Sequence, residues 1–254
     1  MWLFNVVSYD FKYLYNKLTM RHLFLKNVTV VIPTYNSEKT INNTLKSINK
    51  YFNKVIIVDA NSKDLTIEIS KKYKTKIIKS IKGRGSQLLL GAKNVSTDWI
   101  FFLHSDTIIE KNNIIDIKNF ISKDINNYKA ASFKIKFNKN NVWSYLLKTI
   151  VNIRSKYLKL PYGDQGLLIS KNFYKNIGGY KNIPIMEDVE IIRNIGFINI
   201  KILNSHVITD SMRFEDQGWL FRPIINLYCL ALYFLGFNID NINKIYLRNK
   251  NGKS

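Results

Sequence analysis

The sequence predicts an α/β protein whose mostly parallel, Rossmann-like sheet carries helices on both faces. From Val28 onward, short runs of β-branched residues alternate with longer amphipathic runs, as in parallel strands joined by helical crossovers. The 254 residues and 46% hydrophobic content suit one domain with a proper core. We expect an N-terminal extension over residues 1–25, an α/β domain over 26–212 and a C-terminal helical segment over 213–254.

The first part of the chain predicts strands and helices in strict alternation. Each predicted strand is a short apolar run, and each predicted helix begins near a capping residue such as Asn36 or Ser37. The strands are VTVVIPTYN (28–36), KVIIVDAN (54–61), TKIIKSI (75–81) and WIFFLHSD (99–106). The helices cover residues 37–51 and 64–73, and a third follows the tight turn KGRGSQ.

After Asp106 the alternation is looser. We expect helices near 109–121 and 142–158 and over MEDVEIIRNIG, and strands at YKAASFKIKF, GLLIS and INIKILNSHVIT, the first of these exposed. The apolar segment Leu220–Phe237 predicts a buried helix that covers one sheet face. The alternative for that segment is an anchor lying in a membrane surface.

Composition excludes several classes of protein. The single cysteine, Cys229, excludes an intrachain disulfide framework and a cysteine-based metal cluster, and it indicates a reducing compartment. No uncharged apolar run reaches the roughly 18–20 residues that span a bilayer. The net charge of +21 comes from scattered lysines, which do not favour nucleic-acid binding. We expect a cytoplasmic protein, with peripheral contact at the inner face of the membrane as the alternative.

Polar side chains gather where the predicted strands end. They are Thr34, Tyr35, Glu38, Asp59, Arg84 and Gln87. Ligands of open α/β sheets bind beyond the carboxyl ends of the strands, so these residues are candidates for binding. Structural alternatives stay open, since Asn36, Ser37 and Asp64 fit helix caps, Tyr35 fits a packing residue and GRG fits a simple turn.

The fourth strand ends in His104-Ser105-Asp106. Residues two apart in an extended segment point the same way, so the imidazole and the carboxylate can converge. A set with so few protein ligands suits Mg²⁺ or Mn²⁺ when substrate phosphates and water complete the coordination. The alternative is that Asp106 and Thr107 cap the next helix.

The segment MEDVE places Glu187, Asp188 and Glu190 at a predicted helix start. Acids in a first turn stabilise the helix dipole by about 0.3–1 kcal/mol, which is the structural interpretation. Their density in a chain with few acids favours a catalytic role for one of them, as a general base.

These motifs together, in this order, resemble family 2 glycosyltransferases of the GT-A fold. VVIPTYN, VDANSKD, the Asp of HSD and the ED of MEDVE match that family's signature positions over about residues 28–210. The combination of GRGSQLLLGA, FLHSDT, PYGDQG and MEDVE is similar to the radical-SAM/selenodomain-associated subgroup, which is linked to arsenosugar biosynthesis. In the broad family an Asp stands at the position of His104.

The resemblance implies a role for each matched residue. A nucleotide-sugar donor would lie against Thr34, Tyr35, Glu38, Asp59, Arg84 and Gln87, and Asp106 with His104 would hold Mg²⁺ or Mn²⁺. Asp188, with Glu187 beside it, would be the catalytic base of an inverting transfer to an acceptor hydroxyl. Asp164, Gln165 and Arg213 would lie near the acceptor and the diphosphate.

Two other functions are compatible with the sequence. One is a glycosyltransferase at the membrane surface whose acceptor is a lipid phosphate, in place of a small molecule. The other is a non-catalytic, basic GT-A protein that binds nucleic acid or anionic surfaces, and salt-sensitive RNA binding without sugar-nucleotide hydrolysis would identify it.

Overall fold

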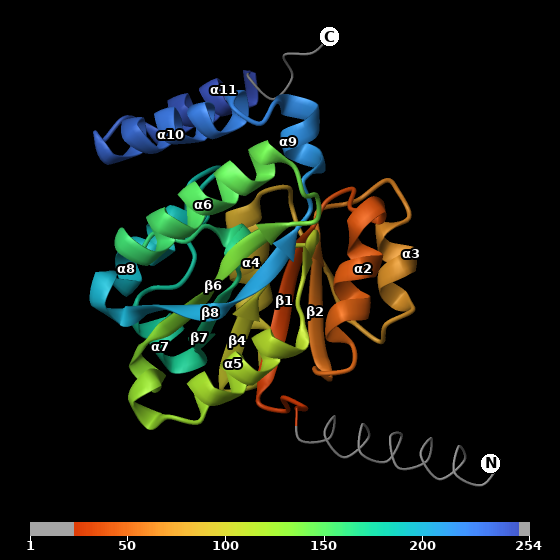
Figure 1. Ribbon diagram of the computed structural model, residues 1–254. Helices are drawn as coiled ribbons and strands as arrows, with labels where there is room; N and C mark the ends of the chain where they lie inside the picture. The colour runs from red at the N-terminus through yellow and green to blue at the C-terminus, as the bar shows by residue number, and fades with distance from the viewer. Residues whose placement is uncertain (1–22, 249–254) are drawn as a thin grey trace, which may run out of the picture.

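A mixed eight-stranded sheet organises residues 23–248, which the computed structural model describes (Figure 1). The strands lie in the order β3-β2-β1-β4-β7-β6-β8-β5. Their bounds are β1 Val28–Thr34, β2 Lys54–Asp59, β3 Lys76–Lys79, β4 Trp99–Phe102, β5 Thr107–Ile108, β6 Ala130–Phe137, β7 Leu167–Ser170 and β8 Ile200–Thr209. The predicted α/β class is confirmed.

One half of the sheet is parallel, and the other half is mixed. β1 pairs in parallel with β2 and with β4, and β2 pairs in parallel with β3. β7 runs antiparallel to both β4 and β6, while β6 and β8 are parallel to each other. The chain order reverses between β1 and β4, and such a switch point opens a crevice at the carboxyl ends of the strands.

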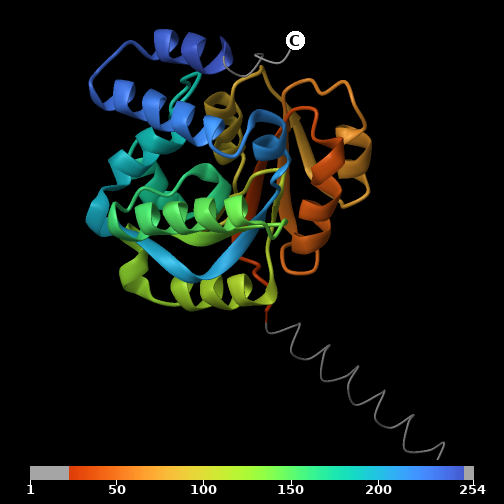
Figure 2. The ribbon, with the colours of Figure 1, turned by 45° about the horizontal axis from the view of Figure 1, so that its top comes forward.

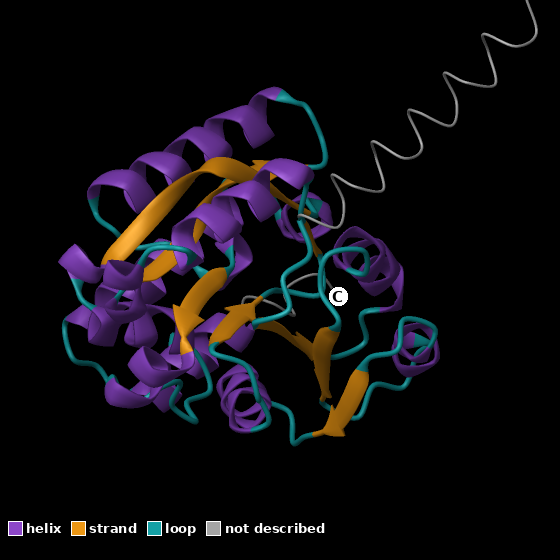
Figure 3. Ribbon diagram, turned by 90° about the horizontal axis from the view of Figure 1, so that it is seen from below, coloured by secondary structure: helices purple, strands orange, loops and turns teal. Residues whose placement is uncertain are grey.

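Helices cover both faces of the sheet, as Figure 3 shows. On one face the apolar side chains of α2 and α5 pack on β1, β2 and β4; on the other, those of α4, α7 and α8 do so. The helix bounds are α2 Glu38–Ile48, α3 Thr66–Lys71, α4 Arg84–Lys93, α5 Lys111–Ile121, α6 Val142–Tyr157, α7 Lys171–Asn176, α8 Glu187–Ile195, α9 Met212–Gln217, α10 Phe221–Phe234 and α11 Ile239–Arg248.

The C-terminal segment forms the helices α9, α10 and α11 at one end of the molecule (Figure 2). Cys229, Leu230 and Leu232 of α10 pack with Ile242 of α11 against the segment that leads into α8. The expected helix over Leu220–Phe237 is therefore present, but the prediction that it covers a sheet face is wrong. Its buried side contacts α11 and the α8 region, and its other side is exposed.

Two further predictions are corrected. YKAASFKIKF does not form an exposed strand, because β6 lies inside the sheet between β7 and β8 and its first four residues are buried. Leu23 and Leu25 belong to the hydrophobic core, so the folded domain begins before residue 26. The rest of the expected extension, residues 1–22, lies outside the described residues. Within 23–248, no helix is both long and apolar enough to cross a bilayer.

Candidate active site

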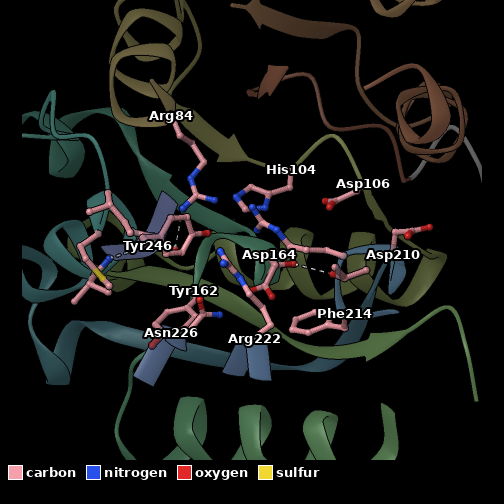
Figure 4. Close-up of a pocket in the computed structure, with 16 residues that line it drawn as sticks. Arg84, His104, Asp106, Tyr162, Asp164, Asp210, Phe214, Arg222, Asn226 and Tyr246 are labelled. Atoms are coloured by element: carbon pink, nitrogen blue, oxygen red, sulfur yellow. Dashed lines mark hydrogen bonds and ion pairs between the residues drawn. The ribbon is translucent and has the colours of Figure 1, made fainter. Parts of the chain in front are cut away.

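A cavity of about 110 Å³ lies beyond the ends of β4 and β8, under the C-terminal helices (Figure 4). Its lining combines acidic and basic side chains from segments that are far apart in the sequence. The lining residues are Arg84, His104, Asp106, Tyr162, Asp164, Ile185, Met186, Asp188, Val189, Thr209, Asp210, Arg213, Phe214, Arg222, Asn226 and Tyr246. Asp106 and Asp188, which come from a strand end and a helix start, thus share one cavity.

The loop between β4 and β5 carries His104 and Asp106. Asp106 Oδ1 is buried and has no hydrogen-bond partner. Burial raises the pKa of Asp106, Arg213 opposes that rise and Asp210 adds to it. Burial also lowers the pKa of His104 well below its ordinary value, and Arg84 and Arg213 lower it further, so the imidazole is neutral at pH 7.

Asp164 lies in the short turn before β7. Its Oδ1 is buried without a hydrogen-bond partner, like that of Asp106. Burial raises the pKa of Asp164 to about 6, with repulsion from Asp188 and Asp106 adding to the effect and Arg154 opposing it. Two buried carboxylate oxygens in one cavity therefore lack a hydrogen-bond donor within the described chain.

The start of α8 presents its acids in different directions. Glu187 is 1% exposed and pairs with Arg84 Nε, while Arg84 Nη2 lies 3.8 Å from Asp188 Oδ2. Burial opposes the charge on Arg84, but the two carboxylates outweigh it and raise the pKa of the guanidinium. Gly163 N donates to Asp188 Oδ2 at 3.1 Å. Asp188 faces the cavity, whereas Glu187 lies behind it and orients Arg84, which corrects its expected catalytic role.

Three of the six candidates for nucleotide binding form a network behind the ends of β1 and β2. Thr34 Oγ1 donates to Asp59 Oδ1 at 2.8 Å, and Gln87 Nε2 donates to the carbonyls of Thr34 at 2.8 Å and Val58 at 2.7 Å. All three side chains are buried. They shape the strand ends and do not line the cavity.

The outer candidates of this set lie nearer the surface. Tyr35 is 43% exposed, with Lys82 Nζ 4.2 Å from its ring centroid. A side-chain oxygen of Glu38 accepts from Leu65 N at 3.0 Å, and Asp64 Oδ2 accepts from Glu38 N at 3.0 Å. These reciprocal bonds tie the start of α2 to the start of α3.

The expected acceptor residues separate in the structure. Asp164 and Arg213 line the cavity, but Gln165 is fully buried. Gln165 Nε2 donates to the Phe133 carbonyl at 2.7 Å, and Gln165 Oε1 accepts from Ser155 Oγ at 2.7 Å. Gln165 thus joins β6 to α6, which corrects its expected contact with an acceptor.

Several lining residues have no counterpart in the sequence-based prediction. Asp210 follows the end of β8, so the strand-end rule that selected Asp106 would also have selected it. Arg222, Asn226 and Tyr246 come from α10 and α11. No sequence signal marks them, because only the folding of the C-terminal helices over the cavity brings them there.

The cavity can accept a divalent cation only with help from a ligand. Within the described part of the chain, no group of three or more His, Cys, Asp or Glu side chains could hold a metal ion. The unpartnered Oδ1 of Asp106 and the neutral imidazole of His104 are suitable metal ligands, but two ligands are too few to hold the ion alone. This donor set fits Mg²⁺ or Mn²⁺ bound together with phosphate oxygens and water.

Among curated proteins, the chain resembles bacterial glycosyltransferases. TarS of Staphylococcus aureus, a poly(ribitol-phosphate) beta-N-acetylglucosaminyltransferase, is 33% identical over 107 residues, which are 37% of this chain and 19% of TarS. YdaM of Bacillus subtilis, a probable glycosyltransferase, is 27% identical over 204 residues, which are 68% of this chain and 48% of YdaM. The matched region thus spans less than half of either relative.

Solved structures and the family model agree. Mycobacterium tuberculosis glucosyl-3-phosphoglycerate synthase, with Mn²⁺ and UDP-glucose, matches with a TM-score of 0.59 at 15% identity over 86% of this chain and 84% of that one. TarS 1-349 from S. aureus, with UDP-GlcNAc, matches with 0.56 at 21% identity over 87% and 70%. These likenesses show the fold. The model "Glycosyl transferase family 2" matches residues 29–181, more than half of the chain. The chain therefore belongs to glycosyl transferase family 2.

Proposed function

We propose that the protein transfers a sugar from a nucleotide-sugar donor to an acceptor hydroxyl, with inversion at the anomeric carbon and with Mg²⁺ or Mn²⁺ as cofactor. The observation that carries the proposal is that Asp106, beyond the end of β4, and Asp188, at the start of α8, line the same cavity. TarS and the mycobacterial synthase, whose structures contain UDP-GlcNAc or UDP-glucose, support the donor class. The arsenosugar subgroup stays a prediction, and loss of arsenosugar production in a host deletion strain is its test.

Asp188 is the proposed general base. Transfer forms a bond from the acceptor oxygen to the anomeric carbon and breaks the bond from that carbon to the diphosphate. The acceptor proton passes to an Asp188 carboxylate oxygen, because an alcohol is too weak a nucleophile without a base. The Gly163 N–H at 3.1 Å and the Arg84 guanidinium at 3.8 Å orient that carboxylate.

The charge of the departing nucleoside diphosphate requires stabilisation on the other side of the cavity. Arg213 lines the cavity and acts electrostatically on Asp106, and a guanidinium keeps its positive charge. Asp106, with an unpartnered buried oxygen, and the neutral His104 would hold the divalent cation. A bound cation would neutralise diphosphate charge as the leaving group departs.

The nucleoside is proposed to lie over the ends of β1 and β2. The buried bonds of Thr34, Asp59 and Gln87 hold those ends in place. Tyr35 and Glu38 lie at the surface of the same region and offer an aromatic ring and a carboxylate to a base or ribose. Arg84 begins α4 beside this region and reaches the cavity.

Two substitutions test the proposal. Asp188→Asn should abolish sugar transfer while nucleotide affinity stays within about twofold, and Asp106→Ala should remove the effect of Mn²⁺ on nucleotide affinity. Calorimetry with UDP and GDP, with and without Mn²⁺, measures affinity, and product formation from a panel of nucleotide sugars measures transfer. Asp124→Asn, an exposed Asp outside the cavity, is the control. Transfer retained by Asp188→Asn would disprove the assignment of the base.

We also propose that the enzyme works at an anionic membrane surface. α6 and α10 carry exposed apolar stripes and contain no acidic residue. The exposed apolar residues are Val142, Trp143, Tyr145, Leu146, Ile150, Ile153 and Tyr157 on α6, and Phe221, Ile224, Leu227, Tyr228 and Phe234 on α10. Such exposure exceeds the single apolar side chains that are normal on monomers.

The charge of the protein supports a lipid bilayer as the partner of this surface. The net charge is +21, and Lys148 and Lys156 on α6 lie over the rings of Tyr145 and Tyr157. Aromatic and aliphatic side chains bordered by lysines are typical of helices that bind anionic membrane surfaces. A lipid-phosphate acceptor would meet the enzyme at this surface.

Flotation with vesicles measures this binding. The wild type should float with vesicles of phosphatidylglycerol and phosphatidylcholine, and much less with phosphatidylcholine alone. The double change Ile224→Asp and Leu227→Asp should abolish flotation, whereas Ile198→Asp, at an 84% exposed site on another segment, should not. Concentration-dependent dimerisation without flotation would assign the surface to a second copy of the chain instead.

A further inference from the structure

Arg222, the second residue of α10, is a buried cation without a hydrogen-bonding partner. It is 2% exposed, and its Nε, Nη1 and Nη2 atoms are all buried without a hydrogen bond to the described residues. Among residues 23–248, the Tyr246 side chain is the main group that compensates its charge, with the ring centroid 4.0 Å from Cζ. An aromatic face attracts a guanidinium but leaves its in-plane N–H donors unsatisfied.

Such an arrangement costs stability in the free protein. A guanidinium keeps its charge in proteins, and an uncompensated buried charge is strongly unfavourable. The first turn of α10 contains no acidic residue that could compensate it, and the helix N-terminus adds positive potential. Burial lowers the pKa of Arg222, and repulsion from Arg213 lowers it further, while Tyr246 opposes both. Unpaired buried groups of this kind are expected at binding sites.

The position of Arg222 separates it from the proposed metal site. Arg222 lines the same cavity as Asp106 and Asp188. In Figure 4 its side chain points to the Tyr246 side of the cavity, while Asp106 and Asp210 lie at the other end. Its charge therefore faces the part of the cavity that the donor diphosphate, held near Asp106, would leave free.

We propose that Arg222 binds an oxyanion, a phosphate or carboxylate group, carried by the acceptor. This proposal rests on the proposed sugar transfer and adds the chemical class of the acceptor. The planar guanidinium can donate two parallel hydrogen bonds to such a group, which is the strongest arrangement for anion recognition. The acceptor hydroxyl would then point to Asp188, with Asn226 at the same wall of the cavity.

Calorimetry on Arg222→Met tests the proposal directly. The probes are glycerol 3-phosphate and inorganic phosphate, each titrated into protein saturated with Mg²⁺ and whichever of UDP and GDP binds. Both should bind the wild type, and the variant should bind them at least about tenfold more weakly. Uncharged glycerol should not distinguish the two proteins. Equal affinity of both proteins for both anions would overturn the proposal.

Further variants separate a binding role from a structural one. Arg222→Met should keep or raise the melting temperature, because it removes an unpaired buried charge; a fall of several degrees would indicate a structural residue. Arg222→Lys keeps the charge but lacks the planar guanidinium with its parallel N–H donors, so it should bind the probes with intermediate affinity. The matched control is Arg193→Met. Arg193 belongs to α8 and lies over the ring of Tyr233 in α10, outside the cavity, so this variant should bind both probes normally.

The source of the anion is distinguished in the same experiment. If Arg222→Met weakens UDP or GDP by about tenfold as well, Arg222 belongs to the donor diphosphate site and the acceptor proposal is wrong. If the wild type transfers no sugar from any nucleotide sugar but its phosphate binding depends on Arg222, only the proposed function fails.

Discussion

Replacing Gly163 by alanine should disturb the active site through one defined contact. A Cβ atom at this position would lie 2.5 Å from His104 Nε2 and 3.1 Å from His104 Cε1. Gly163 is not among the glycines in the left-handed backbone region, so alanine fits its backbone conformation and the expected penalty is the clash. The same residue donates its N–H to Asp188 Oδ2 at 3.1 Å. The imidazole and the proposed base thus meet at one backbone position.

The size of the effect follows from this geometry. Separating the two atoms to van der Waals contact requires His104 or the 163–165 turn to move by about 1 Å, and overpacking of this kind costs about 1–3 kcal/mol. A displacement of about 1 Å at a base can reduce catalysis about 100-fold. We therefore expect Gly163→Ala to lower the free energy of unfolding by about 1–3 kcal/mol and to reduce sugar transfer by about 10- to 100-fold.

A double-mutant cycle with His104→Ala separates this contact from other effects. Without the imidazole, Gly163→Ala should cost almost nothing, or stabilise the protein by up to about 1 kcal/mol by restricting the unfolded chain. Urea unfolding of the four proteins gives the coupling energy, which we expect to be about 1–3 kcal/mol. Equal destabilisation by Gly163→Ala in both backgrounds would refute the steric reasoning.

Three further outcomes follow from single residues. Burial raises the pKa of Asp164 from 3.8 to about 6, so the free energy of unfolding of the wild type should fall as pH rises between these values. Asp164→Asn should lack this fall when urea unfolding is measured across pH, and parallel plots of unfolding free energy against pH for the two proteins would contradict the assignment. Gln87→Ala removes two buried hydrogen bonds to strand-end carbonyls, although the Thr34 carbonyl still accepts from Ala60 N, and it should cost about 1–3 kcal/mol in urea unfolding; a cost below about 0.5 kcal/mol would contradict this role. Gly85→Ala would bring Cβ to 2.4 Å from the Lys181 carbonyl, so its melting temperature should fall by several degrees, and an unchanged value would count against that contact.

The sequence predicts the first half of the sheet well because local and tertiary signals agree there. Each apolar run of β1, β2 and β4 is buried on both faces, and polar residues stand at its end or directly beyond it, at the edge where ligands bind. β6 is different. Its alternating lysines, Lys134 and Lys136, indicate an exposed strand, but both are only half-buried at its end while Ala130 to Phe133 are fully enclosed. Long lysine stems can lie along apolar surface with the charge in water, so lysine spacing alone does not show exposure.

Which polar side chains reach the cavity depends on directions that a motif does not contain. Glu187 and Asp188 are neighbours in MEDVE, yet successive residues of a helix point about 100° apart, and only Asp188 faces the cavity. The same applies to Asp164 and Gln165 in YGDQG, of which one lines the cavity and the other joins β6 to α6. Clusters of polar residues in the sequence therefore locate the site but do not show which of their side chains line the cavity.

One part of the chain matches the family model and the rest does not, and this division bears on what the enzyme acts on. The family model covers residues 29–181 and so contains the strand ends with Asp59 and Asp106, the side of the cavity proposed for the donor. Asp188 and Arg222 lie beyond that region, on elements that close the other side. A fold shared with many transferases cannot supply acceptor identity. The acceptor must therefore be sought through the charges of the C-terminal helices, which makes an anionic acceptor the first class to test.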